Sequence, residues 1–265
     1  MRRVERLTPH LVRVVLGGDF TGFAPQHADS YVKLLFAPPG VSWPDPLDVA
    51  AVREQRPREE WPLLRTYTVR AFDAGRGELT VDLVVHGDEG LAGPWADRAQ
   101  PGDVIHLLGP GGGYRPDPAA DWHLLVGDDS ALPAIAAALE RLPADAVARV
   151  VVEVGSAADE LPLPTPAADV TVRWVHRDTG GPGALVAAAR QAQRPAGTPH
   201  AFLHGEADAV RQLRRWARTE LGVPAERLSA SGYWRRGRTD EAWRAEKQEW
   251  NEAVAQDEAS ASAGR

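Results

Sequence analysis

The tetrapeptide Arg65-Thr66-Tyr67-Thr68 combines residue types whose spacing could do chemistry. In a β-strand, alternation puts Arg65 and Tyr67 on one face and the two threonines on the other. A tyrosine ring offers a flat surface to an aromatic cofactor, and a guanidinium two residues away matches a phosphate. An ordinary Arg–Tyr pair on a strand surface has the same pattern, so the tetrapeptide alone does not decide between the two.

A glycine-rich segment follows an apolar run and reads His86-Gly87-Asp88-Glu89-Gly90-Leu91-Ala92-Gly93-Pro94-Trp95-Ala96. Small residues let a backbone approach a ligand closely, and we expect a helix to begin near Pro94. The free N–H groups and positive dipole of a helix start suit a pyrophosphate. The alternative is an ordinary turn and helix start, with Trp95 anchored in the core.

A third candidate joins an apolar strand to a helix and reads Gly127-Asp128-Asp129-Ser130-Ala131-Leu132-Pro133-Ala134-Ile135. In open α/β sheets, ligands bind beyond the carboxyl ends of the strands. Asp128 and Asp129 would repel a phosphate, so a phosphate would need contacts from Ser130 and the helix backbone. The segment lacks the G-x-G-x-x-G fingerprint, and a helix capped by Ser130 is the simpler interpretation.

The fourth candidate, Ser231-Gly232-Tyr233-Trp234-Arg235-Arg236-Gly237-Arg238, ends the last predicted strand. Its aromatic rings could cover a flat cofactor, and its arginines could attract an anion. The alternative is a solvated arginine cluster beside a packed tryptophan. Trp243 and Trp250 lie on one helical face further on, a spacing that indicates packing.

The first half of the chain must position the first two candidates, and it reads as short strands between turns. Apolar alternation predicts strands within 10–18, 30–40, 63–72, 78–87 and 102–114. Clusters of Gly and Pro separate these strands, and 73–77 supplies a hairpin turn. Several short strands with almost no helix predict a small antiparallel β-barrel.

The second half alternates strands with helices. Strands are predicted within 122–129, 149–155, 169–176, 200–205 and 226–237, and helices within 130–142, 183–193 and 206–222. This alternation predicts a parallel sheet covered on both faces. A last helix should run from Asp240 to about Asn251, and the final residues ASASAGR (259–265) should be disordered.

Pro116 and Pro118 interrupt regular structure between the two halves. We therefore divide the chain into residues 1–117, residues 118–238, and a C-terminal helix and tail over 239–265.

Composition excludes several functions. The 265 residues contain no cysteine, which rules out disulfides, iron–sulfur clusters, thiolate zinc sites and cysteine nucleophiles. Redox chemistry would need an organic cofactor or a metal held by nitrogen and oxygen. The formal charge of −7 argues against nucleic-acid binding. No apolar run approaches the roughly 20 residues that span a bilayer, and the N-terminus is not that of a signal peptide. We expect a cytoplasmic protein.

Taken in order, these segments resemble the siderophore-interacting protein family, a flavin-dependent branch of the ferredoxin–NADP reductase superfold. The resemblance runs from TPHLVRVVLGGDF and SYVKLLFAPPG through RTYTVR, HGDEGLAGPWA, PGDVIHLLGPGG and VGDDSALPAIAAALE to SGYWRRG and the EKQEW helix. It implies an FAD-binding β-barrel over 1–117 and a nicotinamide-binding α/β domain over 118–238. It also implies reduction of ferric siderophores in the bacterial cytoplasm.

The resemblance also assigns residues. Arg65 would bind an FAD phosphate, Tyr67 would stack on the isoalloxazine, and Thr68 would hydrogen-bond near its reactive edge. The remaining implied FAD residues are Val69, Val84, His86, Gly87, Ala92, Gly93, Trp95 and Ala96. Those implied for NAD(P)H or the flavin border are Gly127, Asp128, Ser130, Ala131, Pro133, Glu153, Tyr233 and Trp234.

Two positions depart from the family pattern. Family members usually carry Gly-Pro-Ala-Ser-x-Trp where this chain has Gly90-Leu91-Ala92-Gly93-Pro94-Trp95. The serine hydroxyl is therefore absent at Gly93, and the backbone must do more of the phosphate binding. The usual Gly-Asp-Glu-Thr-Ala is here Gly127-Asp128-Asp129-Ser130-Ala131, a conservative change that leaves nicotinamide binding plausible.

The implied reaction passes a hydride from NAD(P)H to FAD and single electrons from FAD to siderophore-bound ferric iron. No protein acid, base or resident metal is required. Ferric chelates are often anionic, so local cations are expected at the substrate; the candidates are Lys33, Arg235, Arg236, Arg238 and Lys247. Two alternatives stay open: another acceptor, such as a quinone, free flavin or small electron carrier, and a non-enzymatic siderophore carrier without flavin.

Coenzyme choice depends on the residues around the ribose. A carboxylate there favours NADH and an arginine favours NADPH. Glu153 ends the second parallel strand, and no arginine lies between Val150 and Arg173. The sequence therefore favours NADH. We expect the protein to be a monomer.

Overall fold

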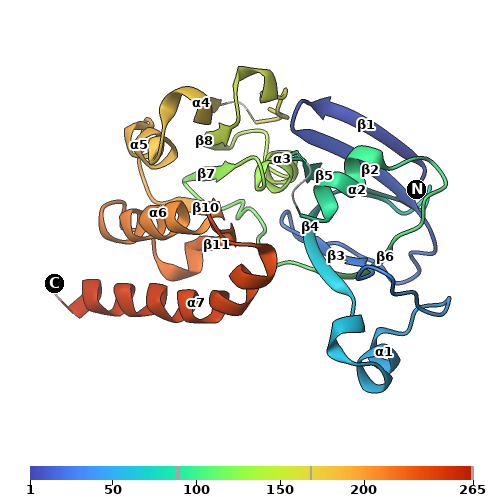
Figure 1. Ribbon diagram of the computed structural model, residues 1–265. Helices are drawn as coiled ribbons and strands as arrows, with labels where there is room; N and C mark the ends of the chain where they lie inside the picture. Colours follow the sequence, from blue (N-terminus) through green and yellow to red (C-terminus); the bar gives the residue numbers. More distant parts are fainter. Residues whose placement is uncertain (88–89, 168, 264–265) are drawn as a thin grey trace.

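Six antiparallel strands form the N-terminal half of the protein (Figure 1). The computed structural model describes residues 1–87, 90–167 and 169–263, with side chains as far as Gln256. The strands are β1 (Arg3–Thr8), β2 (Leu11–Gly17), β3 (Tyr31–Phe36), β4 (Leu63–Asp73), β5 (Glu78–Val84) and β6 (His106–Gly111). Their order is β1-β2-β5-β4-β3-β6. Sequence analysis missed β1, whose exposed and buried residues do not alternate regularly.

The sheet curls around a core and its two ends approach each other. Alternate residues of β2 and β5, such as Val14 and Val81, point into this core and are fully buried, as is Leu34 of β3. The backbone N–H of Gly102, ahead of β6, donates to the carbonyl of Met1, ahead of β1, at 3.0 Å. The predicted β-barrel is confirmed, and its strands follow the apolar alternation of the sequence.

The C-terminal half is a parallel sheet of five strands in the order β11-β10-β7-β8-β9. The strands are β7 (Trp122–Asp128), β8 (Val147–Val154), β9 (Asp169–His176), β10 (Pro199–Glu206) and β11 (Leu228–Trp234). Helix α3 (Leu132–Leu139) packs on one face, while α5 (Ala184–Gln191) and α6 (Ala207–Thr219) pack on the other. The prediction of a parallel sheet covered on both faces is confirmed.

Shorter helices occur at α1 (Val49–Gln55), α2 (Ala92–Arg98) and α4 (Arg177–Gly180), with 3₁₀ turns at 58–60, 157–159 and 225–227. The last helix, α7 (Asp240–Ala263), extends well beyond the predicted end near Asn251, into residues that we expected to be disordered. Its apolar stripe explains the extension as far as Val254, because Trp250 and Val254 continue the row begun by Trp243 and pack against α6. Figure 1 shows α7 running from the junction of the two halves along α6.

The two halves share a hydrophobic cluster. Leu11, Ala28 and Tyr114 from the barrel half are buried together with Ile135 and Leu139 of α3. Arg70 of β4 makes two hydrogen bonds, of 2.7 and 3.1 Å, to the carboxylate of Glu140 after α3. Packing therefore fixes the barrel half, including β4, against α3 on one face of the parallel sheet. Within the described ranges, no helix is long and apolar enough to cross a bilayer.

Candidate functional site

Two segments that the sequence singled out separately meet where the halves touch. Thr68 of β4 is buried, and it lowers the pKa of Tyr233 on β11 against the larger effect of desolvation. The Tyr233 hydroxyl lies 3.0 Å from Nδ1 of His204 on β10, and Nε2 of His204 lies 2.9 Å from the Ser229 hydroxyl. Helix α7, which follows β11, contacts the same barrel strand at Arg65 and Thr66.

Burial keeps the side chains of His204 and Tyr233 uncharged. The His204 ring stacks on Phe202 at a centroid distance of 3.7 Å, and desolvation, with the charge of Lys247 as a smaller cause, lowers the pKa of His204 to about 3. Desolvation also raises the pKa of Tyr233. Sequence analysis missed His204, because a histidine within an apolar strand gives no signal beyond that of a core residue.

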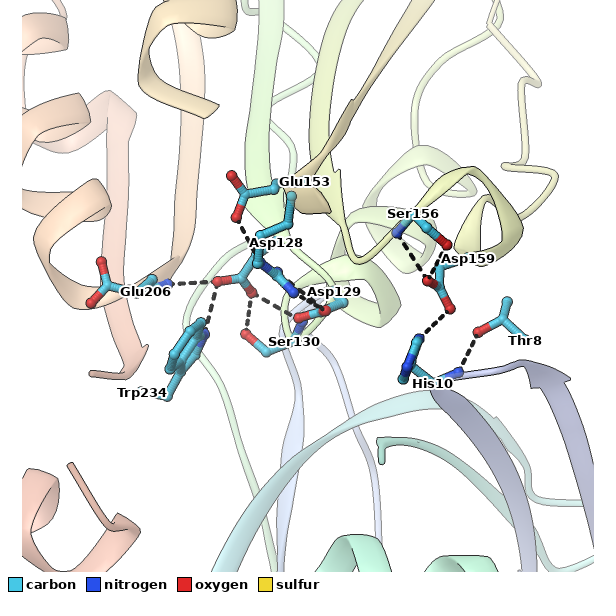
Figure 2. A network of polar contacts seen from close by, with 11 residues as sticks. Thr8, His10, Asp128, Asp129, Ser130, Glu153, Ser156, Asp159, Glu206 and Trp234 are labelled. Carbon is cyan, nitrogen blue, oxygen red and sulfur yellow. Dashed lines mark hydrogen bonds and ion pairs between the residues drawn. The ribbon is translucent and has the colours of Figure 1, made fainter. Parts of the chain in front are cut away.

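A buried carboxylate joins the ends of three strands in the polar network of Figure 2. Asp128, at the end of β7, accepts hydrogen bonds from Trp234 Nε1 at 2.8 Å and from the backbone N–H of Glu206 at 2.7 Å. It also accepts from the backbone N–H and the hydroxyl of Ser130. Desolvation, followed by the charge of Asp129, raises the pKa of Asp128 to about 6.

This network changes the role expected for Ser130. The residue at the N-terminal boundary of α3 is Ala131, and no side chain caps the helix, so Ser130 is not the cap. Both donors of Ser130 point to Asp128, which leaves neither directed at a phosphate. Gly205 makes room for the carboxylate, because a Cβ there, where φ is +136°, would lie 2.6 Å from Asp128 Oδ2. Gly127 allows close packing of β7 on its neighbours, since a Cβ there would lie 2.6 Å from Ala131 Cβ and 2.7 Å from the His204 carbonyl oxygen.

Arg177, the first residue of α4, reaches the ends of β7 and β8. Its Nη1 and Nη2 lie 3.2 Å from Asp129 Oδ2, and its Nε lies 3.1 Å from Glu153 Oε2. Desolvation alone would lower the pKa of Arg177, but Asp129 and Glu153 together raise it. Two carboxylates therefore share one guanidinium. Sequence analysis missed Arg177, which follows the next strand along the chain.

The glycine-rich segment faces the same edge of the sheet. The ring centroid of His86 lies 6.3 Å from that of His10, and partial desolvation, followed by the charge of Arg177, lowers the pKa of His86. His10 Nδ1 lies 2.9 Å from Asp159 Oδ1 in the other half of the molecule (Figure 2). Asp88 and Glu89 of this segment lie outside the described residues.

The remaining side chains of this segment form part of the barrel core. Ala92 and Ala96 are buried in it, and Trp95 packs edge-on against Phe36 with the ring centroids 5.7 Å apart. Trp95 therefore anchors this segment to the barrel core, as expected of an ordinary turn and helix start. Gly93 differs, because a Cβ there would meet only ordinary contacts of 3.5 Å or more, and Gly87 and Gly90 have open space at this position. The segment leaves room for a ligand that lies along its backbone.

Other expected binding residues also have buried side chains. Val69 belongs to the barrel core, while Val84 packs against the cluster around α3. Ala131 and Pro133 are buried at the start of α3. These residues could contact a ligand chiefly through their backbone.

The Arg65–Thr68 strand has contacts that the sequence did not reveal. Arg65 Nη1 lies 3.1 Å from Asp240 and its Nη2 lies 2.6 Å from Glu241, both in the first turn of α7. Tyr67 packs against the barrel core in register with Val32, and desolvation raises its pKa. A phosphate that binds Arg65 must therefore compete with two carboxylates.

Cationic side chains gather between β3, β4 and α7. Lys33 is the direct cross-strand partner of Thr66, and Arg244 Nη2 donates to the Thr66 hydroxyl at 3.3 Å. Lys247, one turn further along α7, is partly buried; desolvation, followed by the charge of Arg244, lowers its pKa. Sequence analysis named Lys33 and Lys247 but missed Arg244. We call Lys33, Arg244 and Lys247 the cation cluster.

The three arginines after β11 lie elsewhere. Arg235 Nη1 lies 3.3 Å from Glu246 of α7, and Arg238 Nε lies 2.8 Å from the same carboxylate. Arg236 is exposed, and its backbone N–H donates to Glu206 at 3.2 Å. Arg235 and Arg238 thus hold the loop after β11 to α7.

Both halves of the chain match known families. Residues 1–114 match the siderophore-interacting FAD-binding domain, and residues 120–237 match the siderophore-interacting protein family. The flavohem-like FAD/NAD-binding domain of a nitric oxide dioxygenase from Vibrio cholerae has the same fold, with a TM-score of 0.62 at 15% identity, over 88% of this chain and 96% of that one.

More similar proteins have related names. The chain is 35% identical to the ferric vibriobactin reductase ViuB of Vibrio cholerae, over 92% of this chain and 91% of that protein. It is 32% identical to the NADPH-dependent ferric-chelate reductase of Escherichia coli, over 88% and 90%. The siderophore-interacting protein SipS from Aeromonas hydrophila superposes with a TM-score of 0.79 at 31% identity, over 95% and 96%. This chain belongs to the siderophore-interacting protein family and has its ferredoxin reductase-like fold.

Proposed function

We propose that this protein binds FAD and reduces ferric siderophores with electrons from NAD(P)H. The observation that carries the proposal is the pairing of Arg65 with Asp240 and Glu241 in the first turn of α7, which brings the barrel strand expected to hold FAD close to the carboxyl end of β11. Ligands of open α/β sheets bind beyond the carboxyl ends of the strands. The FAD-binding family match and the ferric reductases among the relatives support the same function.

The residues around the junction fit FAD. The open backbone at Gly87 and Gly90, with Gly93 in the first turn of α2, would lie along the pyrophosphate. Tyr67 would border the ring system, and Thr68 would hydrogen-bond its edge. FAD supplies the conversion of two-electron donation by a nicotinamide into single-electron transfer. The chain's own task is to bind, orient and shield the reacting groups. We propose units of 1–117, 118–238 and 239–265, which the break between the two family matches at 114 and 120 supports.

The nicotinamide nucleotide would bind at the ends of β7 and β8. We expected NADH because no arginine lies between Val150 and Arg173. The structure removes this reason, since Arg177 donates a hydrogen bond to the Glu153 carboxylate. Its charge is shared by Glu153 and Asp129, so neither a free cation for a 2′-phosphate nor a free carboxylate for a 2′-hydroxyl stands at this position. We therefore propose NAD(P)H as the donor and compare both coenzymes.

The cation cluster is where we place the anionic ferric chelate. Reduction makes the chelate more negative by one charge, so neighbouring cations stabilise the product and the transition state leading to it. Lys33, Arg244 and Lys247 come from β3 and α7, beside Thr66 of the FAD strand. Arg236 could add charge at the rim. Arg244 pairs with Asp240 at 2.6 Å, as Arg235 and Arg238 pair with Glu246, so a chelate at the cation cluster must compete with the Asp240 carboxylate.

The test is anaerobic stopped-flow spectroscopy of the purified protein. We expect a yellow, FAD-containing protein whose flavin absorbance bleaches with NADH or NADPH and returns on addition of a ferric siderophore, with Fe(II) trapped by a chelating dye. Return of the absorbance with a quinone or a small electron carrier but with no ferric siderophore would support another acceptor. A colourless protein that takes up no FAD would contradict the reductase and favour a carrier.

A further inference from the structure

A hydrogen bond joins the two halves of the molecule at the carboxyl edge of the parallel sheet. His10 lies in the turn between β1 and β2, and its Nδ1 is 2.9 Å from Oδ1 of Asp159, the last residue of the 3₁₀ turn after β8 (Figure 2). The His10 side chain is 47% exposed, whereas that of Asp159 is only 4% exposed. The barrel thus supplies a polar partner to a carboxylate that the parallel-sheet half buries.

The carboxylate of Asp159 is also held by its own turn. Its Oδ2 accepts hydrogen bonds from the backbone N–H and the hydroxyl of Ser156, at 3.0 and 3.1 Å. Desolvation alone would raise the pKa of Asp159, but the hydrogen bonds from His10 and Ser156 lower it. The group is therefore ionised and only accepts, so His10 Nδ1 is the donor. Each carboxylate oxygen has its own partner, and the contact with the barrel leaves the turn intact.

The backbone of His10 is tied to the glycine-rich segment. Its N–H donates to the Thr8 hydroxyl oxygen at 3.2 Å, and its carbonyl accepts from the N–H of Val85 at 2.9 Å. Val85 directly precedes His86, the first residue of that segment. A displacement of His10 would therefore reach the backbone that we place along the FAD pyrophosphate.

Asp159 is tied in a similar way to the ends of β8 and β9. A Cβ on Gly155 would lie 2.8 Å from Asp159 Oδ2, so glycine lets the carboxylate pack against the chain that leaves β8. The Gly155 carbonyl accepts from the N–H of Asp178 in α4 at 3.1 Å. The residue before Asp178 is Arg177, which pairs with Glu153. This loop and the Arg177–Glu153 pair are thus one connected unit, and it is here that we place the nicotinamide nucleotide.

A second polar contact between the halves lies at the other end of α3. That helix starts beyond the carboxyl end of β7 and runs back along the sheet, so Glu140, which follows it, is near the amino edge. Arg70 of β4 binds Glu140 there, and the hydrophobic cluster around α3 also joins the halves. Loss of the His10 contact would leave these connections in place but would let the carboxyl edge of the sheet move relative to the barrel.

We propose that the His10–Asp159 hydrogen bond is a positioning clamp that holds the nicotinamide nucleotide at the distance from FAD that hydride transfer requires. The inference rests on the proposed function, in which the nicotinamide is oxidised and the flavin gains its hydride. The two sites lie in different halves, and a misplacement of about 1 Å can cost about a hundredfold in rate. Electron transfer from the reduced flavin to the ferric chelate uses the cation cluster on β3 and α7, so it should not depend on the clamp.

The test compares variants of the holoprotein at full FAD occupancy. His10→Leu removes the donor, and His10→Asn restores an N–H at the same number of bonds from the backbone as Nδ1. Glu140→Gln is the control, because it weakens the other contact between the halves. In anaerobic stopped-flow measurements we expect flavin reduction by NADH or NADPH to slow about tenfold in His10→Leu, to recover in His10→Asn and to stay near the wild-type rate in Glu140→Gln. Reoxidation of the dithionite-reduced protein by ferric citrate, an anionic chelate, should be the same in all variants.

Amide hydrogen exchange, followed by mass spectrometry, reads the contact without turnover. We expect peptides over 155–160 to exchange faster in His10→Leu than in the wild type and in His10→Asn. Unchanged exchange, equal rates of flavin reduction in His10→Leu and the wild type, or an equal fall in Glu140→Gln would each overturn the inference and leave the reductase proposal standing. A wild-type protein that takes up no FAD would contradict the reductase itself, and the inference with it.

Discussion

At the scale of single residues, Asp128 connects the end of the central strand β7 to its neighbours through hydrogen bonds. Its carboxylate is fully buried and accepts from the Trp234 indole, from the backbone of Glu206 and from both donors of Ser130. Each acceptor site faces a donor, so the group is satisfied despite its burial. Trp234, expected to border the cofactor, is held in place by this carboxylate.

The first prediction concerns Asp128→Asn, which would point amide hydrogens at groups that are themselves donors. We expect a loss of about 2 kcal/mol in the free energy of unfolding at pH 8 and a change in tryptophan fluorescence. Because the pKa of Asp128 is raised to about 6, the wild-type group is largely protonated at pH 5 and the loss should shrink there. Ser130→Ala is the control and should cost less. Urea titrations that give equal losses at both pH values would contradict the assignment.

The second prediction concerns Gly93, where the family pattern has a serine. The atoms nearest to a Cβ at this position are backbone atoms of Val84, Val85 and His86, at ordinary contact distances. Gly93→Ser should therefore fold normally and tighten FAD binding several-fold, since it restores a hydroxyl donor for the pyrophosphate. Gly93→Ala adds the carbon without the hydroxyl and is the matched control. Equal FAD dissociation constants for the two variants, measured by fluorescence titration, would exclude this role.

At the scale of elements, α7 links the two halves. Its inner face packs Trp243, Trp250 and Val254 against α6, while its first turn places Asp240 and Glu241 on Arg65 of β4. The side chain of Arg65 is only 13% exposed, so this pairing is less screened than an open surface ion pair. The helix thus holds the cation expected to bind an FAD phosphate.

The third prediction concerns Glu241, whose carboxylate would compete with an FAD phosphate for Arg65. In Glu241→Gln, Arg65 loses its shorter ion pair, so a phosphate no longer displaces a carboxylate at that nitrogen. We expect FAD to bind several-fold more tightly, while α7 becomes more sensitive to limited proteolysis. Glu249→Gln, on the exposed side of the same helix, is the control and should change neither property. Weaker FAD binding in Glu241→Gln would instead show that the carboxylate orients Arg65 for the cofactor.

At the scale of the whole molecule, buried neutral histidines couple folding to pH. His204 and His123 are 4% and 1% exposed, and desolvation lowers their pKa values to about 3 and about 4. A histidine whose folded pKa lies below its unfolded value of about 6.5 binds more protons when unfolded. The folded state therefore loses stability as pH falls below 6.5, and each loss levels off at the folded pKa.

The fourth prediction states how much stability the protein loses on acidification. Between pH 7 and pH 5, each of the two histidines should lower the free energy of unfolding by about 2 kcal/mol. Asp128 acts in the opposite direction, because its pKa is raised and protonation stabilises the folded state through this range. We expect a net loss in urea titrations at the two pH values. His123→Gln should lose about 2 kcal/mol less than the wild type on acidification; an equal loss would exclude His123 as a source.

Much of this architecture could be predicted from local patterns. Alternation in 10–18 and 78–87 gave strands of the barrel, and the change to strand–helix alternation after Trp122 gave the parallel sheet. Arg65–Thr68 was placed correctly within a strand and the other three candidate segments at strand ends, because a strand needs only its own period of two to bury one face. Prediction failed where packing between distant elements set the length of a helix. Helix α7 continues past Asn251, and Val254 packs against α6.

The sequence by itself determined that a β-barrel half precedes a parallel-sheet half, that there is no thiol chemistry, and where along the chain the four candidate segments lie. Only the tertiary structure decided the partners: Asp128 with Trp234, Arg177 with Glu153, Arg65 with Glu241, and His204 with Tyr233. The physical reason is that periodicity reports which face of an element is buried, a local property. An ion pair or buried hydrogen bond depends on how elements far apart in the chain close around it and exclude water.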